Sequence, residues 1–214
     1  MPGTPEFFFV FADTADPMCW HNLRFTKSIM SSGYAAAASD PGFLEHYLKG
    51  TAVYAPFVPN DARTTGFISK FAISAASNYQ VEYDAEYVRF TRYGTLPSRL
   101  SAVYAFGSMD ECEKASIKHR WPLERVKRFR LAEHPLARVH RANMEIISLM
   151  RTVYPRASWN AKERDDIWQH YWSGGGSITV KIPAIINDCP QQKGYSSGEI
   201  WEYLVEGKLE LADA

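Results

Sequence analysis

The chain has 214 residues, of which 46% are hydrophobic and 14% aromatic, enough for one well-buried core. Lysine plus arginine and aspartate plus glutamate number 24 each, so no net charge draws the protein to nucleic acid or to an anionic membrane. The cysteines at 19, 112 and 189 lack metal-ligand spacing, which predicts reduced thiols in the cytoplasm. The apolar run at 7–12 is too short to span a bilayer. We therefore expect a soluble cytoplasmic protein with one domain over residues 1–214 and no membrane partner.

In the first half of the chain, short apolar runs alternate with helical patterns. Residues 6–12 are typical of a buried first strand. Residues 16–32 suit a helix, and a second short helix is expected from Asp40, with Pro41 in its first turn. Residues 51–58 return to strand character. The polar segment 60–66 is a candidate mobile loop, and 67–77 fits a strand or a helix equally well.

The second half has clearer patterns. Aromatic residues or valine alternate with charged residues over 79–93, which predicts a half-exposed strand or hairpin, and 100–106 should be a buried strand. Ser108 with Glu111 forms a capping box for a helix through about His119. Residues 124–131 alternate again, as in a strand. The segments 142–153 and 160–172 are amphipathic helices.

The C-terminal segment from Ile200 to Leu211 alternates apolar and polar residues, which predicts a strand, a turn at Gly207 and a short second strand. Glu199 and Glu202 lie at its start, next to a glycine-bearing loop at 195–198. A carboxylate there, flanked by aromatic residues, could be desolvated in a cleft. The alternative is that both glutamates face solvent on an edge strand.

Several common functional motifs are missing from the sequence. The six histidines show no HxxxH or HxH spacing, and the chain has no GxSxG elbow, P-loop or GxGxxG fingerprint. A Cys–His nucleophile stays an alternative, although Cys112 and Cys189 have no local signature of one. We therefore expect no metal site.

Residues 118–141 form a basic region, with eight lysines and arginines against Glu124 and Glu133. Such a region could bind nucleic acid or an acidic partner protein. The alternative is a solvated strand face whose charge is offset by acidic residues elsewhere.

Three stretches in order resemble a known family. The first is Glu86-Tyr-Val-Arg89 leading through a turn into 97–106, the second is 170–174 (HYWSG), and the third is 199–211 (EIWEYLVEGKLEL). Together they resemble a bacterial and phage family related to ADP-ribosyltransferases, and the third resembles the closing strand of the DNA-targeting ADP-ribosyltransferase toxins. The resemblance covers residues 83–211. The family's first-strand Arg or His has no assigned counterpart here, with Arg24 and His21 as guesses.

The resemblance implies an α+β fold of two packed, mostly antiparallel sheets with flanking helices, and transfer of ADP-ribose from NAD to a protein or nucleic-acid acceptor. Glu202 would stabilise the oxocarbenium-like transition state and Glu199 would orient the acceptor, although the family's glutamates are usually two residues apart and here are three. The implied NAD-binding residues would position the ribose, bind the pyrophosphate or stack on a ring: Ser98 and Ser101, Arg89 or Arg99, and Tyr104 with Tyr171 or Trp172.

Other interpretations stay open. Tyr104 and Trp172 could be packing residues, and Arg99 could form only a salt bridge. The protein could also be a non-catalytic inhibitor that docks residues 118–141 on a host enzyme, or an NAD glycohydrolase toxin that uses water as acceptor.

Overall fold

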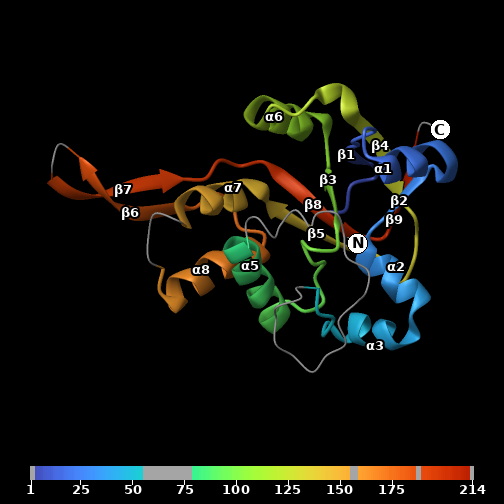
Figure 1. Ribbon diagram of the computed structural model, residues 1–214, viewed down its shortest axis with the longest axis horizontal. Helices are drawn as coiled ribbons and strands as arrows, with labels where there is room; N and C mark the ends of the chain where they lie inside the picture. The colour runs from blue at the N-terminus through green and yellow to red at the C-terminus, as the bar shows by residue number, and fades with distance from the viewer. Residues whose placement is uncertain (1–2, 55–78, 155–158, 187–188, 213–214) are drawn as a thin grey trace.

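The computed structural model describes residues 3–54, 79–154, 159–186 and 189–212, with the side chains of 183–190 left aside. These residues form an α+β fold with one seven-stranded antiparallel sheet, ordered β2-β9-β4-β1-β3-β8-β5, and a separate two-stranded ribbon, β6-β7 (Figure 1). The strands of the sheet are β1 (Phe8–Phe11), β2 (Ser28–Met30), β3 (Val103–Phe106), β4 (Val126–Leu131), β5 (Arg138–Asn143), β8 (Trp201–Glu206) and β9 (Lys208–Leu211). The ribbon consists of β6 (Thr179–Ile186) and β7 (Cys189–Ser196).

The strands β8 and β9 follow each other in the chain, separated only by Gly207, and the neighbouring strands change at this glycine. Before it, β8 lies between β3 and β5, and after it, β9 lies between β2 and β4. At the break, the Gly207 amide donates to Ser31 Oγ at 3.0 Å and its carbonyl accepts from the Ser31 amide at 3.0 Å. A Cβ here would lie 2.7 Å from the Leu131 side chain, so glycine permits this close approach. The predicted strands on either side of Gly207 are confirmed, and a bend stands in place of the predicted turn.

The bend curls the sheet around a core made by its own side chains. Because side chains alternate along a strand, Tyr203 and Val205 of β8 face this core, where Phe8, Phe129 and Leu209 of other strands meet Val205. The opposite face of β8 therefore carries Glu202, Leu204 and Glu206, all buried.

Helices cover that opposite face (Figure 1). The helices α5 (Tyr79–Arg92), α7 (Met144–Val153) and α8 (Ala161–Trp172) share one apolar core with Leu204. The helices α2 (Ser32–Ser39) and α3 (Pro41–Lys49) pack around a second core with Tyr54. The helix α6 (Met109–His119) packs through Cys112 and Ala115 against the end of β3, and the single-turn helix η3 (Leu123–Arg125) follows it.

Polar side chains at the predicted positions begin these helices. Asp40 accepts from the amides of Gly42 and Phe43 at the start of α3, and Ser108 accepts from the amide of Glu111 in α6. Asn160 and Glu163 form a complete capping box at the start of α8. The predicted helices from Asp40, Ser108 and Asn160, the helix that became α7, and the strands that became β1 and β4 are confirmed.

The strand or hairpin predicted for 79–93 is wrong, because this segment is the helix α5. Its buried positions include Val81, Ala85 and Val88 at helical spacing, but Glu82, Glu86 and Arg89 are buried too. Charged residues on the inner face conceal the helical period, and an alternation of aromatic and charged residues remains.

The helix predicted for 16–32 is confirmed only at its start, where Asp16 caps α1 (Pro17–His21), because the segment continues as the π-helical turn η1 (Asn22–Thr26) and the edge strand β2. Lys27, with φ of 52°, ends the turn in a left-handed conformation. The strand expected at 100–106 begins only at Val103, after a turn.

The sheets also differ from the expectation. Where two packed sheets were expected, the described residues form one large curled sheet and a ribbon that extends away from it (Figure 1). The ribbon was not predicted. Within the described part of 51–58, only Val53 forms a bridge, and the segments 60–66 and 67–77, predicted as a loop and as a strand or helix, lie outside the described residues. Among the helices that the structure describes, none is long and apolar enough to cross a membrane.

Candidate active site

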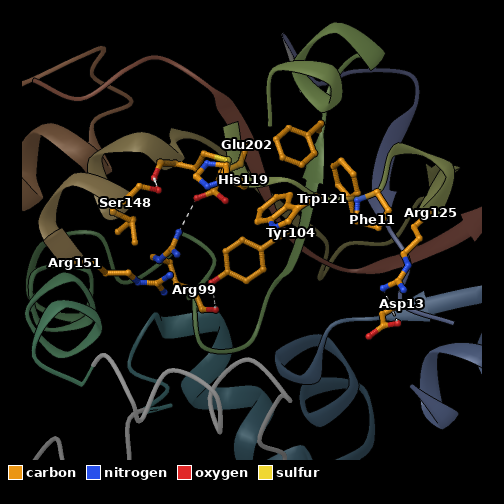
Figure 2. A pocket seen from close by; sticks show the side chains of 14 residues that line it. Phe11, Asp13, Arg99, Tyr104, His119, Trp121, Arg125, Ser148, Arg151 and Glu202 are labelled. Carbon is orange, nitrogen blue, oxygen red and sulfur yellow. Dashed lines mark hydrogen bonds and ion pairs between the residues drawn. The ribbon is translucent and has the colours of Figure 1, made fainter. Parts of the chain in front are cut away.

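A pocket of about 430 Å³ opens where the ends of β1, β3 and β8 meet α6 and α7. Aromatic and aliphatic side chains form much of its wall, and charged groups gather at two places (Figure 2). Arg99, Arg151 and Glu202 lie at one end, and the ion pair of Arg125 with Asp13 lies at the other. The remaining lining residues are Phe11, Tyr104, Phe106, His119, Trp121, Pro122, Met144, Ile147 and Ser148.

Glu202 is a buried carboxylate on the wall of this pocket. The register of β8 sets it between Phe106 of β3 and Ala142 of β5, on the helix-covered face of the sheet. Its Oε1 accepts from Arg99 Nη1 at 2.7 Å and from the Tyr171 hydroxyl at 3.2 Å. Burial raises the pKa of the Glu202 carboxyl above its usual range, and these two donors oppose the rise. Among the described residues, no hydrogen bond reaches Oε2.

Arg99 links Glu202 to a second buried carboxylate. Its Nε donates to Glu82 Oε2 at 3.1 Å, and Arg151 Nη2 donates to Glu82 Oε1 at 2.8 Å. Burial lowers the pKa of Arg99, but Glu82 and the neighbouring groups raise it well above its usual value, so the guanidinium stays charged. The two arginines and the two glutamates of this linked set therefore balance each other's charge in a water-poor environment.

Tyr104 fixes the segment that carries Arg99. The tyrosine ring lies 5.0 Å from the guanidinium carbon, and its hydroxyl donates to the Arg99 carbonyl at 2.6 Å (Figure 2). Because Tyr104 also lines the pocket, one face of the Arg99 guanidinium is covered by an aromatic ring at the pocket wall.

Behind the pocket, a second polar cluster holds the turn before Arg99. Arg89 binds Glu86 through its Nε and Nη2, and its Nη1 donates to the carbonyls of Gly94 and Leu96 at 3.0 and 3.1 Å. Ser98 Oγ donates to Glu86 Oε2 at 2.9 Å. These bonds fix the backbone that delivers Arg99 to the pocket.

Ser101 and the Ser98 amide point to another carboxylate. Both donate to Oε1 of Glu206, which lies on the same face of β8 as Glu202. The Arg138 guanidinium lies 4.0 Å from Glu206 Oε2. The two serines therefore position the turn rather than line the pocket.

The predicted site residues thus divide into three groups, which line the pocket or contact it, lie behind it, or lie away from it. Arg99, Tyr104 and Glu202 line the pocket, and Tyr171 contacts Glu202 from the side of α8. Buried bonds behind the pocket hold Arg89, Ser98 and Ser101.

Trp172 and Glu199 lie away from the pocket. Trp172 is 1% exposed in the helical core, and its Nε1 donates to the Ala85 carbonyl at 2.8 Å, as its packing alternative predicted. Glu199 is exposed and accepts from the Ser177 amide at 3.0 Å. The structure therefore does not bring Glu199 and Glu202 together.

Other pocket residues have no signal in the sequence that marks them as functional. Arg151 lies on the amphipathic helix α7, where a basic residue near the C-terminal end is ordinary. His119 is the last residue of α6 and Trp121 lies two residues further on, with no motif around either of them. They reach the pocket through the packing of α6 against β3, which no local pattern reports.

The basic region 118–141 is largely paired within the molecule. Ion pairs to Glu145, Asp13, Glu6 and Glu206 hold the side chains of Lys118, Arg125, Arg130 and Arg138. Arg128 and Arg141 lie over the rings of Phe7 and Trp201. Acidic residues from other elements therefore offset the charge of this region.

Neither a scan against protein-family models nor a search of curated proteins found a match. Among the described residues, no group of three or more histidine, cysteine, aspartate or glutamate side chains could hold a metal ion.

Proposed function

We propose that the protein transfers ADP-ribose from NAD to a macromolecular acceptor, a protein or a nucleic acid, in the pocket that Glu202 lines. The observation that carries the proposal is the buried Glu202 carboxylate, whose Oε1 is fixed by Arg99 and Tyr171 while Oε2 takes no hydrogen bond from the described residues. A carboxylate held in this way is preorganised for a positive charge that develops in the pocket.

Cleavage of the nicotinamide–ribose bond develops such a charge. The ribose takes on oxocarbenium character as nicotinamide leaves, as a sugar ring does in glycoside hydrolysis. Glu202 stabilises this charge and accepts a hydrogen bond from a ribose hydroxyl. Arg99 and Tyr171 hold the carboxylate in place, so that no reorganisation is needed when the bond breaks.

The rest of the wall suits the other parts of NAD. Tyr104, Trp121 and Phe11 offer aromatic surfaces for a flat nicotinamide or adenine ring. Arg151, at the same end of the pocket as Glu202, offers paired N–H donors for the pyrophosphate that adjoins the nicotinamide ribose. The pocket volume of about 430 Å³ lies within the range of roughly 300–1,000 Å³ typical of small-molecule sites.

An ADP-ribosyltransferase-like fold is part of the same proposal. It is supported by a large antiparallel sheet with helices on one face and by the position of Glu202 on β8, the strand that directly precedes β9 in the sequence. A cytoplasmic site of action is also proposed, and the free thiol of the buried Cys112 is consistent with it.

The test uses NAD labelled in its adenylate moiety, incubated with cell lysate and either wild-type protein or Glu202→Gln. We expect wild type to label a macromolecule and the variant to lose labelling while it unfolds at a similar temperature. Consumption of NAD without labelling would assign the glycohydrolase activity instead. A wild type that neither binds nor consumes NAD would refute the proposal.

A further inference from the structure

A histidine–carboxylate pair borders the same pocket and has no role in the reaction as described so far. His119 is the last residue of α6, lines the pocket and keeps a side-chain exposure of 20%. Its Nε2 lies 2.8 Å from Oε1 of Glu145, whose side chain is 2% exposed. We propose that His119, positioned by Glu145, is the general base that accepts the proton of an acceptor hydroxyl. This inference rests on the proposed function and names the chemical class of its acceptor.

The pair is held rigidly. The His119 ring stacks on Trp121, with centroids 5.1 Å apart and planes at 30°. Glu145 lies in the first turn of α7, where the helix dipole favours a carboxylate, and Lys118 binds its Oε2. A base whose ring is oriented by a buried carboxylate is the arrangement that nucleophile activation requires.

The same scaffold carries Glu202. Asn143, the N-cap of α7, accepts from the amides of Glu145 at 3.1 Å and Ile200 at 3.2 Å, and its side chain donates to the Gly198 carbonyl at 2.9 Å. Ile200 lies two residues before Glu202. One side chain therefore ties the carboxylate that orients His119 to the start of the strand that bears Glu202. Figure 2 shows His119 and Glu202 lining one pocket.

The hydrogen bond to Glu145 sets which ring nitrogen can act. A neutral imidazole that donates from Nε2 to a carboxylate carries its lone pair on Nδ1. Among the described residues, no hydrogen bond reaches Nδ1. His119 lines the pocket, and its ring therefore offers Nδ1 as a proton acceptor that takes no hydrogen bond from the described residues.

The transfer step balances with this base. The acceptor oxygen forms a bond to C1 of the ribose, the bond from C1 to the nicotinamide nitrogen breaks, and its electron pair leaves with neutral nicotinamide. The hydroxyl proton passes to His119 Nδ1 and later to water. An alcohol is a weak nucleophile until it loses its proton, so this chemistry gains most from a positioned base.

The experiment compares His119→Asn and His119→Ala with wild type, with His134→Asn as the control because His134 is exposed and outside the pocket. The readouts are the NAD dissociation constant and the single-turnover rate of label transfer. We expect NAD binding within about threefold of wild type and transfer slower by about 10²–10⁴-fold in both variants, the usual contribution of a general base. Added imidazole should restore transfer in His119→Ala by at least about tenfold and leave Glu202→Gln inactive.

Other results would overturn the inference. A transfer rate of His119→Asn within about threefold of the wild-type rate would show that His119 is not the general base. A loss that appears in NAD binding instead of the transfer rate, or that imidazole does not restore, would make the pair a structural link between α6 and α7. In each of these cases wild type still transfers label, whereas failure of the proposed function appears as an inactive wild type. Treatment of the labelled product with protease or nuclease shows which macromolecule brings the hydroxyl.

Discussion

Arg99→Met tests how strongly the buried charge network holds the fold together. Arg99 contacts two carboxylates that are each 3% exposed, Glu82 and Glu202, and the methionine would fill much of its volume without its charge. After the substitution, Glu82 keeps Arg151, whereas Glu202 keeps only the Tyr171 hydroxyl. Glu202 is therefore the group that loses its counter-charge.

The magnitude follows from the burial of Glu202. Breaking a buried ion pair by removing one partner leaves an uncompensated charge and costs about 3–5 kcal/mol. We therefore expect the free energy of unfolding of Arg99→Met to fall by about 3–5 kcal/mol at pH 7. Adding Glu202→Gln removes the stranded charge, so the double variant should recover about 1–3 kcal/mol of that loss.

Urea unfolding at pH 7 measures these differences, with the dependence on urea concentration checked for constancy. The control is Arg92→Met, which breaks the Arg92–Asp165 pair, whose side chains are 50% and 31% exposed. That variant should change the free energy of unfolding by less than about 1 kcal/mol. A loss in Arg99→Met as small as in the control, or additive losses in the double variant, would refute the reasoning.

Two further predictions concern a buried histidine and a tight turn. Burial lowers the pKa of His140 to about 4, so the unfolded chain takes up a proton below its ordinary pKa of about 6.5 before the folded chain does. The free energy of unfolding should therefore fall by up to about 3 kcal/mol between pH 6.5 and 4 through this group. Urea titrations of His140→Leu should lack that part of the fall. A variant with the same pH dependence of stability as wild type would contradict the prediction. Gly50 has φ of 70°, and a Cβ there would lie 2.5 Å from the Gly94 carbonyl carbon. Gly50→Ala should lower the free energy of unfolding by about 1–3 kcal/mol and the melting temperature by at least about 2 °C. An unaltered melting curve would show instead that the backbone at this turn can shift to admit the Cβ.

Local signals were sufficient for part of the fold. Asp40, Ser108 and Asn160 sit directly before helical patterns, and capping depends only on neighbours in the sequence. The break at Gly207 was visible because alternation continues on both sides of it. The α+β class was expected from the family resemblance, whereas the curl of the sheet depends on pairing between β9 and both β2 and β4, which no local pattern records.

The pocket was predictable only in its central residues. Arg99 and Glu202 stood out as polar residues next to strand signals, yet their contact joins positions 103 residues apart. Arg151 and Glu82 are 69 residues apart, and Glu82 was assigned to a strand because its burial hides the helical period of α5. Glu199 shows the converse limit, since closeness in sequence to Glu202 did not bring it to the pocket.

The release of free nicotinamide from NAD tests the central claim most directly, because it reports bond cleavage whichever acceptor is used. Purified wild type, Glu202→Gln and Glu210→Gln would be compared, the last being an exposed glutamate further along the same C-terminal segment. We predict release by wild type and Glu210→Gln at similar rates and a rate at least about 100-fold lower in Glu202→Gln. Release by Glu202→Gln at the wild-type rate, or no release by wild type in the presence of lysate, would contradict the assignment of Glu202.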